Sequence, residues 1–245
     1  MRLRDAFSTP STRRRYVRAL FATIADRYDL ITVVLSGGRD RRWKRRLADL
    51  AAPRPRSRAL DLACGTGDIA FELAARGVRV VGLDVTSRMV TLARTKAAMR
   101  SDLPAQPAFL VGDMMALPFA DQAFDLVTAG YGLRNAPELA PALHEALRVL
   151  RPGGRLLSLD FNRPDHPVVR RVYLAWLTLV GSVLGFLLHR DPDTYRYIPE
   201  SIRRYPGASQ VVQHLQRAGF AEVAWHPVLG GLMAVHTATR PSSGG

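Results

Sequence analysis

Apolar residues along this chain follow two patterns that alternate with each other. Short apolar runs bounded by glycine, proline or charged residues are typical of buried strands. Segments with apolar residues three and four positions apart, as at 17, 20, 21 and 24, are typical of amphipathic helices. The first pattern predicts strands over 59–62, 78–83, 108–111, 124–129, 155–161, 222–226 and 232–238.

Helices are expected in the intervals between these strands and near the N-terminus. Thr86 or Ser87 is a suitable helix cap, and Pro137 suits a first helical turn. Gly77 and Gly219 lie where two helical patterns stop. The second pattern therefore predicts helices over 13–27, 39–51, 68–76, 87–99, 137–150 and 209–218.

This alternation of strands and helices predicts the fold class. Strands that alternate with helices form a parallel sheet with right-handed crossovers. We therefore expect a Rossmann-like, doubly wound α/β fold, with a mostly parallel seven-stranded sheet and helices on both faces. The chain has 245 residues, which favours a single domain over 1–245. Basic N-terminal helices (1–52) and an apolar insertion at about 163–208 are added to that alternation.

One apolar segment within the insertion is long enough to compare with a membrane span. Residues 172–188 contain no charged side chain, and Arg170, Arg171, His189 and Arg190 flank them. Seventeen residues are at the short limit for a transmembrane helix. We therefore expect a helix that is buried or lies in a membrane interface. The N-terminal residues do not resemble a signal peptide, because no apolar run with a cleavage site follows them.

Charge is concentrated at the N-terminal end. The formal net charge is +14, and residues 1–58 carry 16 basic against 5 acidic side chains. Such an end favours a polyanionic surface, either nucleic acid or anionic lipid, although a solvated arginine-rich face is an open alternative. The single cysteine, Cys64, excludes an internal disulfide and a four-cysteine zinc site and favours a reduced cytoplasmic setting. His144 has no second histidine four residues later, so we expect no metal.

The first candidate for chemistry is the stretch LDLACGTGD at 60–68. Gly65 and Gly67 allow positive φ angles and let a ligand approach the backbone closely. A G-x-G turn alone also fits a dinucleotide-binding loop. Asp61 discriminates between the two, because a carboxylate before the turn repels a pyrophosphate and suits the ammonium group of S-adenosylmethionine.

Two further acidic residues end the next two predicted strands. Asp84 lies 19 residues after Gly65, where a carboxylate can accept both ribose hydroxyls of a nucleotide. Asp113 can accept from an adenine amino group while Met114 packs on the ring. Carboxyl ends of neighbouring parallel strands form the ligand crevice of open α/β sheets. The three carboxylates favour an S-adenosylmethionine-dependent methyltransferase over an NAD enzyme.

Several longer stretches carry a family resemblance. The chain resembles the ubiquinone/menaquinone biosynthesis C-methyltransferase family, a class I methyltransferase family, from about residue 15 to 240. The glycine loop and the Pro-Gly-Gly turn occur in many methyltransferases, whereas YGLRN at 131–135 and the stretch at 195–202 are more specific. The matching stretches are 27–29, 35–37, 43–44, 60–68, 116–119, 131–135, 148–161, 195–202, 218–220, 230–231 and 234–236.

The resemblance implies methylation of a ring carbon of a polyprenylated quinol precursor, such as a demethylmenaquinol or a 2-methoxy-6-polyprenyl-benzoquinol. It also implies cofactor contacts from Thr66, Asp84, Asp113 and Met114, with Gly130 lining the pocket. Together with neighbouring motif residues, the predicted cofactor site comprises Tyr28, Asp61, Gly65, Thr66, Gly67, Asp84, Val85, Asp113, Met114 and Gly130.

Ring-carbon methylation requires an ionised quinol hydroxyl, which pushes electron density onto the ring. Arg134 is our candidate to stabilise that oxyanion, with a surface ion pair as the alternative. Asn135 could orient a water, and Tyr197 or His236 could bond a quinol oxygen. His236 could equally be a strand histidine bonded to the backbone. The predicted catalytic residues are therefore Arg134, Asn135, Tyr197 and His236.

The expected partners follow from the prenylated substrate. Residues 167–188 could hold the prenyl tail and contact a membrane, with basic N-terminal helices meeting anionic headgroups on its inner face. We expect no nucleic-acid partner, because no base-flipping loop is recognisable; a homodimer is left open. Alternative functions are methylation of another hydrophobic aromatic or polyketide, a nucleic-acid methyltransferase, and a non-catalytic S-adenosylmethionine-binding partner.

Overall fold

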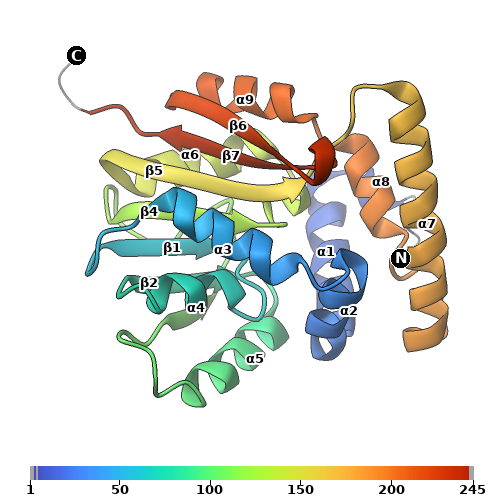
Figure 1. The fold of residues 1–245 in the computed structure, drawn as a ribbon, viewed down its shortest axis with the longest axis horizontal. Coiled ribbons are helices and arrows are strands. Elements are labelled where there is room, and N and C mark those ends of the chain that lie inside the picture. The colour runs from blue at the N-terminus through green and yellow to red at the C-terminus, as the bar shows by residue number, and fades with distance from the viewer. Residues whose placement is uncertain (1–2, 4, 243–245) are drawn as a thin grey trace.

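The computed structural model describes residue 3 and residues 5–242, and in this part of the chain seven strands form one sheet (Figure 1). The strand order is β3-β2-β1-β4-β5-β7-β6. All pairings from β3 to β5 are parallel, and β7 is antiparallel to both β5 and β6. The strands are β1 (Arg58–Leu62), β2 (Arg79–Asp84), β3 (Ala108–Val111), β4 (Phe124–Gly130), β5 (Leu150–Phe161), β6 (Ala221–Val228) and β7 (Met233–Thr239).

The predicted fold class is confirmed, including the mostly parallel sheet. The order reverses between β1 and β4, because the chain first builds outwards to β3 and then returns to the other side of β1. That reversal is the switch point at which open α/β sheets bind ligands. The last two strands are antiparallel because a short turn, η4 (Leu229–Gly231), joins them as a hairpin.

Helices cover both faces of the sheet, and each face has its own apolar core. The core under α3, α4 and α5 includes Leu47, Leu73 and Val90. Leu143 and Val211 represent the core under α6 and α9. These helices are α3 (Asp40–Ala51), α4 (Asp68–Ala74), α5 (Ser87–Ala98), α6 (Leu139–Val149) and α9 (Ala208–Arg217).

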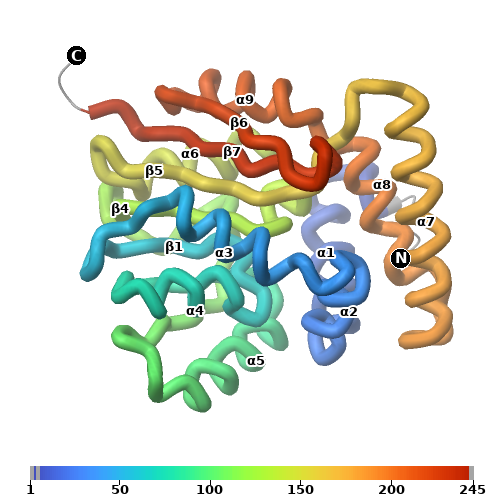
Figure 2. The backbone as a smooth tube through the Cα atoms, viewed as in Figure 1, coloured from blue at the N-terminus to red at the C-terminus, as the bar shows by residue number. Residues whose placement is uncertain are grey.

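Four more helices lie beyond the carboxyl ends of the parallel strands (Figure 1). In Figure 2 the N-terminal helices, in blue, lie beside the orange helices from the last third of the chain. Ile24, Ile31 and Tyr195 share one buried cluster between these two parts, and Phe7 stacks on Tyr197. The four helices are α1 (Pro10–Ile24), α2 (Tyr28–Ser36), α7 (Pro167–His189) and α8 (Tyr197–Arg204).

The structure corrects several predicted boundaries. The single helix predicted over 13–27 is α1 followed by a separate 3-10 turn, and α1 begins earlier because the Thr9 side chain caps it. The helix predicted from Pro137 begins at Leu139, because Ala136 is extended, as residues before proline tend to be. Helices α2 and α8 were not predicted. The first is almost uniformly apolar, so no polar face marks it as a helix, and the second is only eight residues long.

Helix α7 is the apolar segment singled out in the sequence. Within the described residues it is the one helix long and apolar enough to cross a membrane by length and composition. Tyr173, Leu174 and Leu177 on one face are buried. Gly181 and Gly185 on the same face let the backbone around Tyr195 and Asp191 approach closely. The opposite face remains exposed.

Candidate active site

Two cavities meet at the switch point of the sheet. The strand-end cavity lies over the loops that follow β1, β2, β3 and β4, and its walls include Tyr28, Gly65 and Asp84. The apolar cavity, of about 870 Å³, lies between α2, α7 and α8. Phe21, Tyr28 and Tyr131 line both cavities, so these aromatic side chains form the boundary between them.

Asp84 is placed by hydrogen bonds from two backbone groups. Its carboxylate accepts from the Gly65 N–H at 2.9 Å and from the Thr86 N–H at 2.8 Å, which ties the β1 and β2 loops together. Burial raises the pKa of Asp84, while these two N–H donors act in the opposite direction. Each oxygen retains a lone pair, so the carboxylate can still accept hydroxyl groups from a ligand in the strand-end cavity.

Asp113 and Met114 lie on the β3 loop at the same cavity. One Asp113 oxygen accepts from the Met115 N–H at 2.9 Å and the other pairs with Arg14 of α1 at 3.0 Å. The carboxylate predicted to meet adenine is therefore also a link between the sheet and the N-terminal helices.

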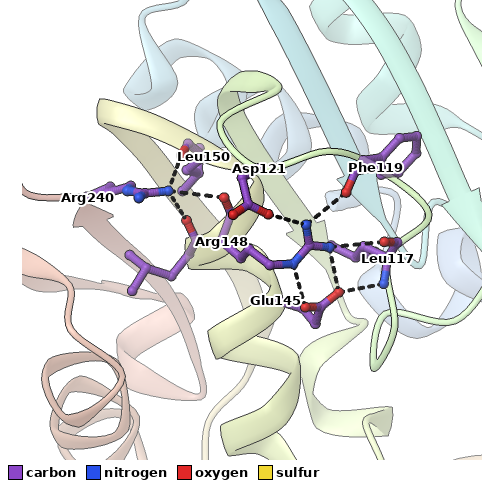
Figure 3. Close-up of polar contacts among 8 residues, drawn as sticks. Leu117, Phe119, Asp121, Glu145, Arg148, Leu150 and Arg240 are labelled. Carbon is purple, nitrogen blue, oxygen red and sulfur yellow. Dashed lines mark hydrogen bonds and ion pairs between the residues drawn. The ribbon is translucent and has the colours of Figure 1, made fainter.

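A salt-bridged cluster fixes the loop that carries these residues (Figure 3). Arg148 of α6 donates to the carbonyl oxygens of Leu117 and Phe119 and pairs with Glu145 and Asp121. Glu145 also accepts from the Leu117 N–H at 2.6 Å. The matching stretches at 116–119 and 148–161 therefore have a structural role, because they hold the β3 loop against α6.

A small polar recess opens beside the glycine turn and is lined by Lys44, Thr66 and Asp68. Thr66 donates to Asp29 at 2.6 Å, which joins the turn to α2. Lys44 pairs with Asp68 at 2.7 Å. The recess thus offers both charge signs, as the ammonium and carboxylate of an amino acid require.

These groups together fit S-adenosylmethionine. Asp84 provides acceptors for ribose hydroxyls, and Leu83, Met89 and Met114 supply an apolar setting for a flat ring. The polar recess supplies charged partners for the methionine portion. In the described residues, no group of three or more His, Cys, Asp or Glu side chains is arranged to hold a metal. The bound methyl donor would supply an electrophilic sulfonium carbon.

Most of the predicted cofactor residues lie together. Thr66 lines the polar recess. Gly67 is left-handed and packs tightly against Phe71 and Phe109, so it serves the turn and does not line either cavity. The predicted cofactor residues on the strand-end cavity are Tyr28, Gly65, Asp84, Val85, Asp113, Met114 and Gly130, and the predicted catalytic residue Asn135 also lies there.

Asp61 lies behind the glycine turn and does not line any of the three cavities. One carboxylate oxygen accepts from Thr128 at 2.8 Å, and the other is buried without a partner in the described residues. Burial raises the pKa of Asp61 to about 7. Asp61 was predicted to face the ammonium group of the cofactor, but in this structure its carboxylate does not reach any of the three cavities.

His236 is likewise away from both cavities. Its Nε2 donates to the Ala208 carbonyl at 3.1 Å, and burial lowers its pKa to about 4. This is the backbone-bonded strand histidine that the sequence left as an alternative, and the structure does not bring it to the predicted catalytic group.

Arg134 lies at the wall of the apolar cavity, but it is buried and not at the surface. Its Nε pairs with Asp160 at 3.1 Å, and its guanidinium also bonds Ser201 of α8. The alternative of a surface ion pair is therefore wrong. Arg134 joins β5, the turn after β4 and α8, with its positive charge close to the apolar cavity.

Asn135 and Tyr197 form a second polar pair near this wall. Tyr197 donates to the Asn135 side-chain oxygen at 3.2 Å, and Asn135 donates to the Tyr131 carbonyl at 3.0 Å. Asn135 lines the strand-end cavity and Tyr197 the apolar cavity. The two residues therefore connect the cavities, as a catalytic pair would need to.

The sequence interpretation missed Asp40 and Tyr131. Tyr131 donates to Asp40 at 2.8 Å, and Asp40 pairs with Lys44 at 2.6 Å in a buried setting. Tyr131 was noted only as part of the YGLRN stretch, and Asp40 lies in the helix predicted over 39–51 but was not singled out. Only the fold brings these residues, 91 positions apart, into contact.

Comparison with known families decides what this arrangement belongs to. The sequence profile of the ubiE/COQ5 methyltransferase family matches residues 9–240. The chain belongs to the ubiE/COQ5 methyltransferase family. Relatives of this family member include a demethylmenaquinone methyltransferase of Thermus thermophilus, 42% identical over 91% of this chain and 100% of the relative. The ubiquinone/menaquinone biosynthesis C-methyltransferase UbiE of Dinoroseobacter shibae is 40% identical over 90% of this chain and 89% of the relative.

Solved structures agree with the fold of this ubiE/COQ5 family member. A SAM-dependent methyltransferase of Thermotoga maritima matches with a TM-score of 0.65 at 19% identity, over 91% of this chain and 99% of that one. The [4+2]-cyclase SpnF matches with a TM-score of 0.62 at 24% identity, over 81% of each chain. These likenesses concern the fold alone, since a cyclase shares it with methyltransferases.

Proposed function

We propose that this protein transfers the methyl group of S-adenosylmethionine to a ring carbon of a polyprenylated quinol in menaquinone or ubiquinone biosynthesis. The observation that carries the proposal is the junction of the strand-end cavity with an apolar cavity of about 870 Å³. The first suits the methyl donor, and the second suits a ring with a prenyl chain. Family membership supports the same reaction class.

The proposed roles of the cavity residues follow from the chemistry. A quinol ring carbon becomes nucleophilic when an adjacent hydroxyl loses its proton. Arg134, held by Asp160, places a permanent positive charge at the apolar cavity, where it would stabilise the oxyanion. Asn135 and Tyr197 would orient the ring oxygens or a water between the two cavities.

The substrate assignment is tested by turnover. Purified protein is incubated in detergent micelles with labelled S-adenosylmethionine and either a reduced demethylmenaquinol or a 2-methoxy-6-polyprenyl-benzoquinol. We expect label on a ring carbon, and the preferred ring identifies the pathway. Cofactor binding without labelling of either quinol would contradict the proposal and favour another hydrophobic aromatic, a polyketide or a non-catalytic role.

We also propose that α7 attaches the protein to the anionic inner face of the cell membrane. Val172, Trp176, Leu179, Val183 and Phe186 are all exposed and spaced three or four residues apart, so they form one apolar stripe.

Charge and cavity position support the same surface. Arg171 and Arg190 are exposed beside the stripe and suit anionic headgroups. Trp176 and Val172 on α7, and Val34 on α2, are exposed and also line the apolar cavity. A prenyl chain could therefore pass from the bilayer into this cavity. Homodimer formation stays a prediction.

Replacing Leu179 and Phe186 together by glutamate is expected to reduce binding to anionic vesicles by at least about 100-fold. Each side chain contributes roughly 1.5–3 kcal/mol on burial in lipid, and this is lost when it becomes charged. Neither residue lines the apolar cavity, so turnover of a short-chain quinol in solution should persist. Vesicle co-sedimentation measures the effect.

Met99→Glu is the matched control, because Met99 is an exposed apolar residue at the end of α5, away from α7. It should sediment with vesicles like the wild type. Equal binding by the Leu179/Phe186 variant would show that α7 does not attach the protein.

A further inference from the structure

Tyr131 occupies the boundary between the two cavities in an unusual backbone conformation. It follows β4 with a φ of +58°, a left-handed value that is uncommon for an aromatic residue. Its N–H donates to the Leu159 carbonyl at 2.7 Å, and its ring packs on Phe161. Tyr131 lines the strand-end cavity, the apolar cavity and the polar recess. Tyr131 therefore lies where the proposed quinol cavity meets the proposed cofactor cavity.

The tyrosine hydroxyl leads to a buried carboxylate. Tyr131 donates to Asp40 Oδ1 at 2.8 Å, and Asp40, which is 3% exposed, also lines the apolar cavity. Lys44 Nζ lies 2.6 Å from Asp40 Oδ2 and 2.7 Å from Asp68. Asp40 therefore shares the Lys44 ammonium with Asp68, and Lys96 Nζ lies 3.7 Å from Asp68. The Tyr131 hydroxyl thus contacts a carboxylate that also lines the apolar cavity.

The reaction needs a proton acceptor at this point. Arg134 cannot serve, because a guanidinium stays protonated. His236 cannot serve either, because it lies away from both cavities. Among the described side chains that line the apolar cavity, Asp40 is the one carboxylate.

We propose that Tyr131 and Asp40 form the relay that takes the proton from the quinol hydroxyl, with Lys44 positioning Asp40. This inference rests on the proposed function and names its proton acceptor. The quinol O–H bond breaks as its proton passes to the Tyr131 oxygen and the Tyr131 proton passes to Asp40. The Tyr131 phenol therefore stays neutral throughout the transfer.

The remaining steps balance without another reagent. The ring carbon bonds the methyl carbon as the C–S bond breaks, and that electron pair stays on sulfur. The resulting dienone loses its ring proton to water, which restores the aromatic ring as a phenolate. The phenolate takes back the proton held by Asp40, so the net products are a methylated quinol, S-adenosylhomocysteine and one proton in solvent.

The electrostatics around the relay agree with this direction of transfer. Burial and the neighbouring Asp40 raise the pKa of Tyr131, so its phenolate is disfavoured and transfer through it must be concerted. The charged and titratable groups that face the relay come from α2, α3, α4, α5 and β5. They are Tyr28, Lys44, Asp68, Lys96 and Asp160.

The test compares Asp40→Asn and Tyr131→Phe with Asp49→Asn. Asp49 lies on the same helix and forms an exposed pair with Arg76, so it controls for the substitution itself. We expect kcat to fall at least about 100-fold in Asp40→Asn and Tyr131→Phe. The dissociation constant for S-adenosylmethionine and the KM for quinol should change by less than about threefold. Asp49→Asn should match the wild type.

The pH profile separates a proton relay from a structural role. Without the acceptor, only quinol that is already ionised reacts, so kcat of Asp40→Asn should rise about tenfold per pH unit towards the pKa of the quinol. Asp40→Glu should recover part of the lost rate.

Three results would overturn the relay. The first is wild-type-like kcat and pH dependence in Asp40→Asn or Tyr131→Phe. The second is a loss of kcat matched by an equal loss of cofactor affinity in both variants. The third is a wild type that methylates neither quinol, which would overturn the proposed function and the relay together.

Discussion

Replacing Asp84 by alanine is expected to weaken S-adenosylmethionine binding by at least about 100-fold. The carboxylate accepts from the Gly65 and Thr86 N–H groups and faces the strand-end cavity, so its removal costs the ribose acceptors and loosens both loops. A hydrogen bond to a charged group contributes roughly 1.5–3 kcal/mol, and about 2.8 kcal/mol corresponds to 100-fold. Isothermal titration calorimetry measures the change.

Asp102→Ala provides the control for this substitution. Asp102 is exposed at the turn after α5 and pairs only with Arg100 in the described residues. Its removal should leave cofactor affinity unchanged. A change of less than about fivefold in Asp84→Ala would contradict the assignment of the ribose site and of the cavity as the cofactor site.

The second large effect is expected on stability, in Asp160→Ala. Asp160 is 2% exposed and accepts from the Arg134 side chain, the Arg134 N–H and the Phe161 N–H. Burial raises the pKa of Asp160, and the Arg134 charge counteracts that shift. Removing the Asp160 carboxylate leaves the buried Arg134 guanidinium without its partner. This typically lowers the free energy of unfolding by about 3–5 kcal/mol. The free energy of unfolding in urea, measured without cofactor, tests this.

An exposed ion pair supplies the comparison. Asp121 pairs with Arg148 (Figure 3) at 2.8 Å, but its side chain is 71% exposed, so Asp121→Ala should cost less than about 1 kcal/mol. The double variant Arg134→Met/Asp160→Ala should recover part of the stability, because it no longer buries an unpaired charge. Equal losses of unfolding free energy in Asp160→Ala and Asp121→Ala would contradict this prediction. They would show that the buried Arg134–Asp160 pair matters no more for stability than an exposed pair.

These predictions separate two layers of the molecule. Asp84 belongs to the sheet and its loops, which form the proposed site of the methyl donor. Asp160 and Arg134 join that sheet to α8, which lies with α1, α2 and α7 beyond the carboxyl ends of the parallel strands. Residues of both layers line the apolar cavity. Changes in α7 and α8, which do not line the strand-end cavity, should therefore affect quinol turnover more than cofactor binding.

Local rules explain why the sequence was informative about the sheet. A buried strand, a glycine turn and an acidic residue at a strand end each depend on neighbours within a few positions. Parallel strands then bring Asp84 and Asp113 to one edge without further information. The fold class and the group of cofactor residues around Asp84 could therefore be predicted from the order of residues alone.

Long-range contacts explain what the sequence did not reveal. Asp61 and His236 have suitable chemistry, but both side chains are buried and bonded inside the protein, Asp61 to Thr128 and His236 to the Ala208 carbonyl. Nothing in the sequence indicates that Tyr131 and Asp40 contact each other, because only the fold brings their side chains together. The sequence by itself determined the parallel sheet and its cofactor edge, because those follow from local periodicity. Only the tertiary structure decided which polar groups face the substrate, because that depends on contacts between segments far apart in the chain.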